Sequence, residues 1–166
     1  MRQSSIYSLF LVGMLSPCLA FAGEHKEVKV IPIVTNEAYM KNCGSCHFAY
    51  QPGLLPARSW VKIIDRGGHP GGNLSIDRKA KSEIKNYLEQ NSAEKSPAKR
   101  SRKILDSIGG DTPVRISEIS YIKQKHREIS QDVFMRKAIG SRSNCVACHR
   151  SAARGVYEDD DVVIPK

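Results

Sequence analysis

The residues of this chain best suited by type and spacing to bind a cofactor lie in two copies of one five-residue pattern. Residues 43–47 read CGSCH and residues 145–149 read CVACH. C-x-x-C-H is the attachment pattern of c-type haem, in which two thiols bond to one porphyrin and the adjacent imidazole binds the iron. Both copies are complete, so the sequence predicts two covalently bound haem c groups. The predicted attachment residues are Cys43, Cys46 and His47 for haem 1 and Cys145, Cys148 and His149 for haem 2.

The same cysteines allow three other interpretations: a zinc site, a thioredoxin-like redox pair and a structural disulfide. Two C-x-x-C pairs that build one zinc site usually enclose about 15–20 residues, whereas these pairs lie far apart in the chain. A dithiol enzyme would carry its C-x-x-C beside alternating strands and helices, a pattern that we do not find here. The spacing therefore favours haem.

Each haem needs a second axial ligand, and one further histidine in each half is placed to supply it. His69 lies in the loop GGHPGG at 67–72, whose glycines would let the backbone approach a flat ligand closely. His126 falls on the apolar side of an expected helix. We predict His69 as the distal ligand of haem 1 and His126 as that of haem 2. The alternatives are an exposed loop histidine, a core histidine, and thioether ligation by Met40 or Met135.

Residues 1–22 have the pattern of a secretory signal peptide. Arg2 precedes an apolar run over 6–15, and AFA at 20–22 fits an A-x-A cleavage site. The apolar run is too short to span a bilayer. We therefore expect a periplasmic protein that is not a transmembrane protein. Cleavage would remove Cys18 and leave all four remaining cysteines in the two haem motifs.

The chain is basic, with 26 lysines and arginines against 17 acidic residues and a formal charge of +9. Export makes nucleic acid an unsuitable partner, so an acidic redox protein or an anionic membrane surface is the better match for this charge. The polar stretch 91–103 supplies candidates for such a docking face. These are Lys95, Lys99, Arg100, Arg102 and Lys103.

The elements that must position the ligands are short amphipathic helices, and the sequence shows no convincing strands. In the first half, the first helix is expected over 36–42. The second would run from Pro56 to a stop at Gly67, with Trp60, Ile63 and Ile64 on one face. The third would follow a Ser75 cap and carry on one face Ala80, Ile84, Tyr87 and Leu88. In the second half, one helix capped by Ser120 would carry Ile122, His126 and Ile129, and another with Phe134, Ala138 and Ile139 would end at Gly140.

This order of elements predicts a mainly α protein built from two small haem modules. Residues 91–103 lack apolar periodicity and contain Pro97, which is typical of an exposed linker. The expected division is an N-terminal haem domain over 23–90, a basic linker over 91–103 and a C-terminal haem domain over 104–166.

The combined features resemble the bacterial periplasmic dihaem cytochrome c (DHC) family. Four segments carry the resemblance: NEAYMKNCGSCHFAYQPGLLPARSW, GGHPGGNLS, YIKQKHREI and AIGSRSNCVACHRSAARGVYEDDDVVIPK. The resemblance implies an electron carrier with a class I cytochrome c-like N-terminal domain and a less regular C-terminal haem domain. It also implies bis-histidine ligation, by His47 with His69 and by His149 with His126. The implied redox partners are an oxygen-binding monohaem cytochrome c or a membrane cytochrome b.

Two histidine ligands at each iron would leave no open position for peroxide or oxygen, and they would lack the methionine that raises the potential of ordinary cytochromes c. We therefore predict a low-potential relay between a membrane donor and a soluble acceptor rather than an enzyme. The alternatives are a dihaem peroxidase or sulfur-compound oxidoreductase, and a gas sensor whose distal histidine leaves when the gas binds.

Overall fold

The computed structural model describes residues 27–65 and 69–166. The predicted signal peptide at 1–22, His25 and the predicted helix stop at Gly67 lie outside the described residues. Across the described ranges the chain forms α-helices and 3-10 turns, and extended pairing is limited to two isolated bridges. The prediction of a mainly α fold is confirmed. No helix in these ranges has both the length and the apolar character needed to cross a bilayer.

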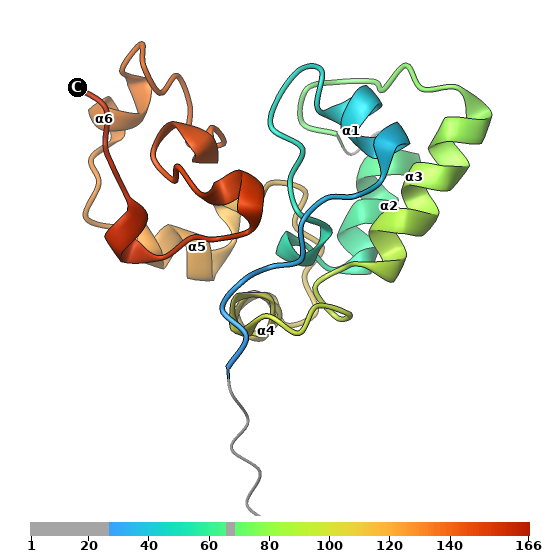
Figure 1. Cartoon of the computed structure of the whole chain (residues 1–166), viewed down its shortest axis with the longest axis horizontal. Helices are drawn as coiled ribbons and strands as arrows, with labels where there is room; N and C mark the ends of the chain where they lie inside the picture. The colour runs from blue at the N-terminus through green and yellow to red at the C-terminus, as the bar shows by residue number, and fades with distance from the viewer. Residues whose placement is uncertain (1–26, 66–68) are drawn as a thin grey trace, which may run out of the picture.

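Three helices form the first lobe, drawn in blue to green on the right of Figure 1. They are α1 (Glu37–Cys43), α2 (Ala57–Asp65) and α3 (Arg78–Gln90), and α3 packs against both of the others. A 3-10 turn at Pro52–Leu54 precedes α2. Their apolar faces meet in a core that includes Tyr39, Trp60, Ile63, Ile64, Ile84 and Leu88. The helix α1 ends at the first haem cysteine, so its packing fixes where the first motif begins.

The start of α3 differs from the prediction in its capping residue. Asp77, not Ser75, is the N-cap, and its carboxylate accepts hydrogen bonds from the backbone N–H groups of Lys79 and Ala80, both at 3.0 Å. A carboxylate is also favoured at a helix N-terminus by the helix dipole. The helix therefore begins closer to its first apolar residue, Ala80, than the predicted cap at Ser75 implied.

The segment predicted as an exposed linker contains the start of a helix that sequence analysis missed. Helix α4 runs over Lys99–Ile108, and the residues before it include the buried Ser92, Ala93 and Ala98. One face of α4 is apolar only from Ile104 onward, because its first turn is Lys-Arg-Ser-Arg. This charged first turn masks the apolar periodicity of the helix in the sequence. The helix lies between the lobes in Figure 1, where it contacts α5 and the 3-10 turn before α2.

The second lobe has little regular structure. It contains α5 (Ser120–Lys125), α6 (Gln131–Met135) and 3-10 turns at Ile116–Glu118, Cys145–Ala147, Ala152–Arg154 and Asp159–Asp161. Both helices are shorter than predicted. Ile119, not Ser120, is the N-cap of α5, and the helix ends before His126, so Ile129 lies beyond it. Helix α6 ends before Ala138 and Ile139, because Arg136 adopts an extended conformation (ψ 141°).

The lobes are joined by two sets of buried contacts. The N-terminal segment runs between them (Figure 1): the Ile31 N–H donates to the Gly155 carbonyl at 3.0 Å, and Ile31 is fully buried. Gly155 has φ +73°, and a Cβ there would lie within 1.9 Å of the Ile31 carbonyl oxygen. In the second set, the buried Gln51 amide donates to the Ala152 carbonyl and accepts from the Tyr157 hydroxyl, both at 2.6 Å. These contacts hold the lobes in one arrangement around the site.

Candidate haem sites

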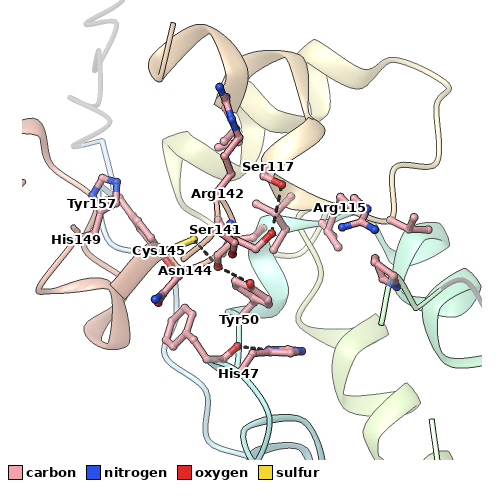
Figure 2. Close-up of a pocket in the computed structure, with 18 of the residues that line it drawn as sticks. His47, Tyr50, Arg115, Ser117, Ser141, Arg142, Asn144, Cys145, His149 and Tyr157 are labelled. Atoms are coloured by element: carbon pink, nitrogen blue, oxygen red, sulfur yellow. Dashed lines mark hydrogen bonds between the residues drawn. The ribbon is translucent and has the colours of Figure 1, made fainter. Parts of the chain in front are cut away.

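One cavity of about 980 Å³ is shared by the two lobes. Its walls contain all eight residues predicted to hold haem: Cys43, Cys46, His47 and His69 from the first lobe, and His126, Cys145, Cys148 and His149 from the second. Figure 2 shows part of this space, with His47 and His149 reaching it from different segments. The competing ligands Met40 and Met135 do not line the cavity, and both are exposed. The fold therefore brings the predicted ligands together and leaves out their competitors.

The four histidines form two pairs with equal separation between the ring centroids. The ring centroids of His47 and His69 lie 6.0 Å apart with an interplanar angle of 13°, and those of His126 and His149 lie 6.0 Å apart with an angle of 75°. Two metal–nitrogen bonds of about 2.0 Å in line place imidazole centroids about 6 Å apart, because each centroid lies about 1.1 Å behind its nitrogen. Each pair thus has the spacing that fits one iron.

Backbone carbonyls set the protonation of two of these rings. Nδ1 of His47 lies 2.8 Å from the Phe48 oxygen, and Nδ1 of His126 lies 2.8 Å from the Ile122 oxygen. A carbonyl only accepts, so each Nδ1 must carry the proton and donate it. This leaves the lone pair on Nε2, which is the form of imidazole that binds a metal.

His69 differs from His47 and His126 in that its Nδ1 lies beside a backbone N–H group rather than a carbonyl. The Gly71 N–H donates to His69 Nδ1 at 3.1 Å, and a Cβ at residue 71 would lie 2.9 Å from the His69 Cε1. Burial lowers the pKa of His69, and the charges of His47 and Arg115 lower it further, which favours the neutral ring. With Nδ1 accepting, the proton of the neutral ring sits on Nε2. Binding iron through Nε2 therefore requires this proton to move to Nδ1 and the Gly71 hydrogen bond to open.

His149 is partly buried. Burial lowers its pKa, and the charges of His126 and Arg100 act in the same direction. Its ring meets the Tyr157 ring edge-on at 5.5 Å, and its Nδ1 is buried without a hydrogen-bond partner in the described residues. A neutral imidazole held in a fixed orientation is suited to metal binding.

The cysteines are free thiols in the described part of the chain, with no disulfide between them. Burial raises the pKa of both Cys43 and Cys145 to about 11. The thiolate is the form that attacks disulfides, so these environments disfavour the dithiol interpretation. Over residues 27–65 and 69–166, no group of three or more histidine, cysteine or acidic side chains is placed to hold a metal ion by itself.

The charge of the cavity suits an anionic ligand. Four cationic side chains line it, against one carboxylate: Arg100, Arg115, Lys125 and Arg142, and Asp159. A haem carries two carboxylates at its edge, so two haems would bring four negative charges to a wall with an excess of three positive charges (4 − 1). The donor set, the histidine spacing and the charge of the wall all fit two haems.

Sequence analysis missed Tyr50, which lies where the two sets of ligands meet. Its hydroxyl donates to the Ser143 carbonyl at 2.6 Å, and its ring centroid lies 5.2 Å from that of His47 (Figure 2). Burial, together with the nearby Cys145, raises the pKa of the phenol to about 12, so it stays protonated. An aromatic residue three positions after a proximal histidine was the available signal in the sequence.

Part of the predicted basic docking face is used within the fold. Lys99 and Arg102 both form ion pairs with Glu27, and Arg100 is directed into the protein. The side chain of Arg100 is only 15% exposed and lies 3.8 Å from the Glu158 carboxylate. Lys95, Arg102 and Lys103 remain exposed, so a basic docking face stays a prediction, with fewer charges than expected.

Comparison with known proteins identifies the family of this chain. The sequence profile of the "Dihaem cytochrome c" (DHC) family matches residues 39–157. A diheme cytochrome c from Rhodobacter sphaeroides is 39% identical, with 75% of this chain and 98% of that chain covered and a TM-score of 0.64. The diheme cytochrome type c of Shewanella baltica OS155 is 33% identical, with coverage of 80% and 95% and a TM-score of 0.63.

A crystal structure of DHC purified from Rhodobacter sphaeroides is 35% identical, with coverage of 76% and 100% and a TM-score of 0.59. The comparison with curated proteins gave no match. The family match covers most of the chain and spans both C-x-x-C-H motifs, which accounts for two covalently bound c-type haems. The chain therefore belongs to the dihaem cytochrome c family.

Proposed function

We propose that this protein is a periplasmic electron carrier whose two haem irons are each bound by two histidines. The observation that carries the proposal is the pairing of His47 with His69 and of His126 with His149 at one separation of 6.0 Å. Cytochromes c are typically electron carriers. A haem supplies a one-electron couple, and two strong nitrogen ligands keep both axial positions filled in both oxidation states.

The shared cavity supports transfer between the haems. Both sets of cysteines line one cavity, so the two cofactor sites are neighbours. Tyr50 lies between them, since its ring faces His47 and its hydroxyl binds the carbonyl two residues before Cys145. We infer that Tyr50 positions the two haems relative to each other. An electron received at one haem can then leave from the other.

The remaining details of the proposal come from sequence. The pattern at 1–22 supports export to the periplasm. We propose a membrane cytochrome b or an oxygen-binding monohaem cytochrome c as redox partner, as the family resemblance implies. We also propose that residues 23–90 and 104–166 act as separate haem domains. In that division the stretch 91–103, which includes the start of α4, packs between them.

Replacing one distal ligand at a time tests the ligation. We expect His69→Ala and His126→Ala each to open one iron, to convert it partly to high spin and to allow carbon monoxide to bind there, because a strong ligand has been removed. Met135→Ala is the matched control, since this side chain is 66% exposed and lies outside the cavity. Absorption and electron paramagnetic resonance (EPR) spectra of each variant report the change. A histidine variant with spectra like those of the unaltered protein would remove that residue from the ligand set.

A further inference from the structure

One buried cation beside the cavity lacks a partner for one of its donors. Arg100 lies in the first turn of α4, and its Nε is buried with no hydrogen-bond acceptor in the described residues. Each of its other two nitrogens makes one hydrogen bond: Nη2 donates to the Tyr157 carbonyl at 2.7 Å, and Nη1 donates to the Tyr121 hydroxyl at 3.3 Å. A donor on a charged group that is buried without an acceptor is costly. The polypeptide therefore leaves one position of this guanidinium for another group.

The position of Arg100 points to the second haem. Its side chain lines the cavity, and its guanidinium lies over the Tyr157 ring, 5.7 Å from the centroid. The Tyr157 ring in turn meets the His149 ring, with the two centroids 5.5 Å apart. Arg100 is thus linked through one aromatic ring to the proximal ligand of haem 2.

Other charges near Arg100 do not supply the missing acceptor. Glu158 approaches Nη2 at 3.8 Å, is itself shared with Lys29, and makes no hydrogen bond to Nε. Asp159 is paired with Lys125. The other cations of the wall are more exposed, and Arg142 already donates to Gln131. Arg100 is the most enclosed of the four.

We propose that Arg100 binds a carboxylate of haem 2 through its Nε–H group and raises the reduction potential of that haem. The proposal rests on the assignment of haem 2 to His126 and His149 made above. A guanidinium is the side chain best shaped to hold a carboxylate, and the resulting hydrogen bond is charge-assisted. Reduction lowers the charge of the iron by one, so a fixed positive charge in a poorly solvated wall favours the reduced form.

The test compares three variants of the haem-loaded protein. Arg100→Gln removes the charge, Arg100→Lys keeps it without the planar fork, and Arg102→Gln is the control, because Arg102 is on the same helix but is 64% exposed and paired with Glu27. Potentiometric titration followed by EPR resolves the two haems. We expect Arg100→Gln to disfavour reduction of haem 2 by about tenfold, equal to about 59 mV for one electron. Arg100→Lys should shift it less, and Arg102→Gln should leave it unchanged.

A second readout tests the contact itself. Resonance Raman bands of the haem carboxylate side chains should shift in Arg100→Gln and not in Arg102→Gln. Unchanged carboxylate bands and an unchanged potential of haem 2 would overturn the proposal, as when an internal water accepts the bond from Nε.

If Arg100→Gln does not incorporate haem, the contact can be tested in the unaltered protein. The measurement is then infrared redox difference spectroscopy with ¹³C-labelled haem carboxylates. One carboxylate band displaced from the solvent-exposed position supports the contact, and the absence of a displaced band refutes it. High-spin or carbon monoxide-binding spectra of the unaltered protein would instead show that the proposed bis-histidine ligation has failed.

Discussion

The buried hydrogen bonds of Gln51 lead to a quantitative prediction about how the two lobes are held together. The Gln51 side chain is fully buried, donates to the Ala152 carbonyl and accepts from the Tyr157 hydroxyl, so it contacts the second lobe twice. In Gln51→Leu the buried Tyr157 hydroxyl would lose its acceptor, whereas the Ala152 carbonyl would lose one bond and still accept from the Gly155 N–H. The unsatisfied hydroxyl costs about 1–3 kcal/mol and the lost bond to Ala152 about 0.5–1.5 kcal/mol, so we expect the free energy of unfolding to fall by about 1.5–4.5 kcal/mol.

Tyr157→Phe should have a smaller effect on stability, and it removes one of the two hydrogen bonds that Gln51→Leu removes. Tyr157→Phe removes the hydroxyl and leaves only one oxygen of Gln51 without a donor, so we expect a loss of about 1–3 kcal/mol. In the double variant the shared hydrogen bond can be lost only once. The two single effects should therefore exceed the double effect by about 0.5–3 kcal/mol, the usual range for residues in contact.

Guanidinium chloride unfolding of the haem-loaded protein, followed by far-ultraviolet circular dichroism and by Soret absorption, measures each free energy. Tyr87→Phe is the control, because its hydroxyl accepts only from the Thr35 N–H at an exposed position of the first lobe. We expect that variant to lose less than Tyr157→Phe. Strict additivity of Gln51→Leu and Tyr157→Phe, or a loss under about 1 kcal/mol for Gln51→Leu, would refute the reasoning.

Two glycine substitutions test close contacts. Gly71→Ala should displace the His69 ring, because the added Cβ would lie 2.9 Å from its Cε1, and should produce a partly high-spin haem 1 that binds carbon monoxide; Gly110→Ala, with open space around it, should not. Gly155→Ala should lower the free energy of unfolding far more than Gly109→Ala. Both residues have positive φ, but only the Cβ at 155 would meet a carbonyl oxygen at 1.9 Å. Equal spectra in the first pair, or equal denaturation midpoints in the second, would contradict these contacts.

The sequence predicted best those features that depend on local spacing. The two C-x-x-C-H motifs and the apolar faces of α2 and α3 are complete within short windows, and α1, α2 and α3 form close to where they were expected. Capping was less predictable. Asp77 and Ser75 are both suitable N-caps, and only the folded backbone shows which side chain reaches the free N–H groups.

The features that sequence analysis missed depend on contacts between distant residues. Helix α4 begins with a charged turn whose partners, Glu27 and Glu158, lie 72 and 58 positions away in the chain. The role of Tyr50 depends on Ser143, which is 93 positions away. The short helices α5 and α6 were predicted too long because the predicted apolar spacing continues past their ends, into turns where Arg136 and Gly140 change direction. Composition does not encode any of these pairings.

The most direct test of the central claim, two bis-histidine haems in one protein, is spectroscopic. Absorption and EPR spectra of the oxidised protein, and absorption spectra of the reduced protein with and without carbon monoxide, report the ligands of both irons. We predict two low-spin signals, which differ because the histidine planes cross at 13° in one pair and 75° in the other. We also predict no change on adding carbon monoxide. A high-spin signal, or carbon monoxide binding by the unaltered protein, would contradict the account and favour a sensor or an enzyme.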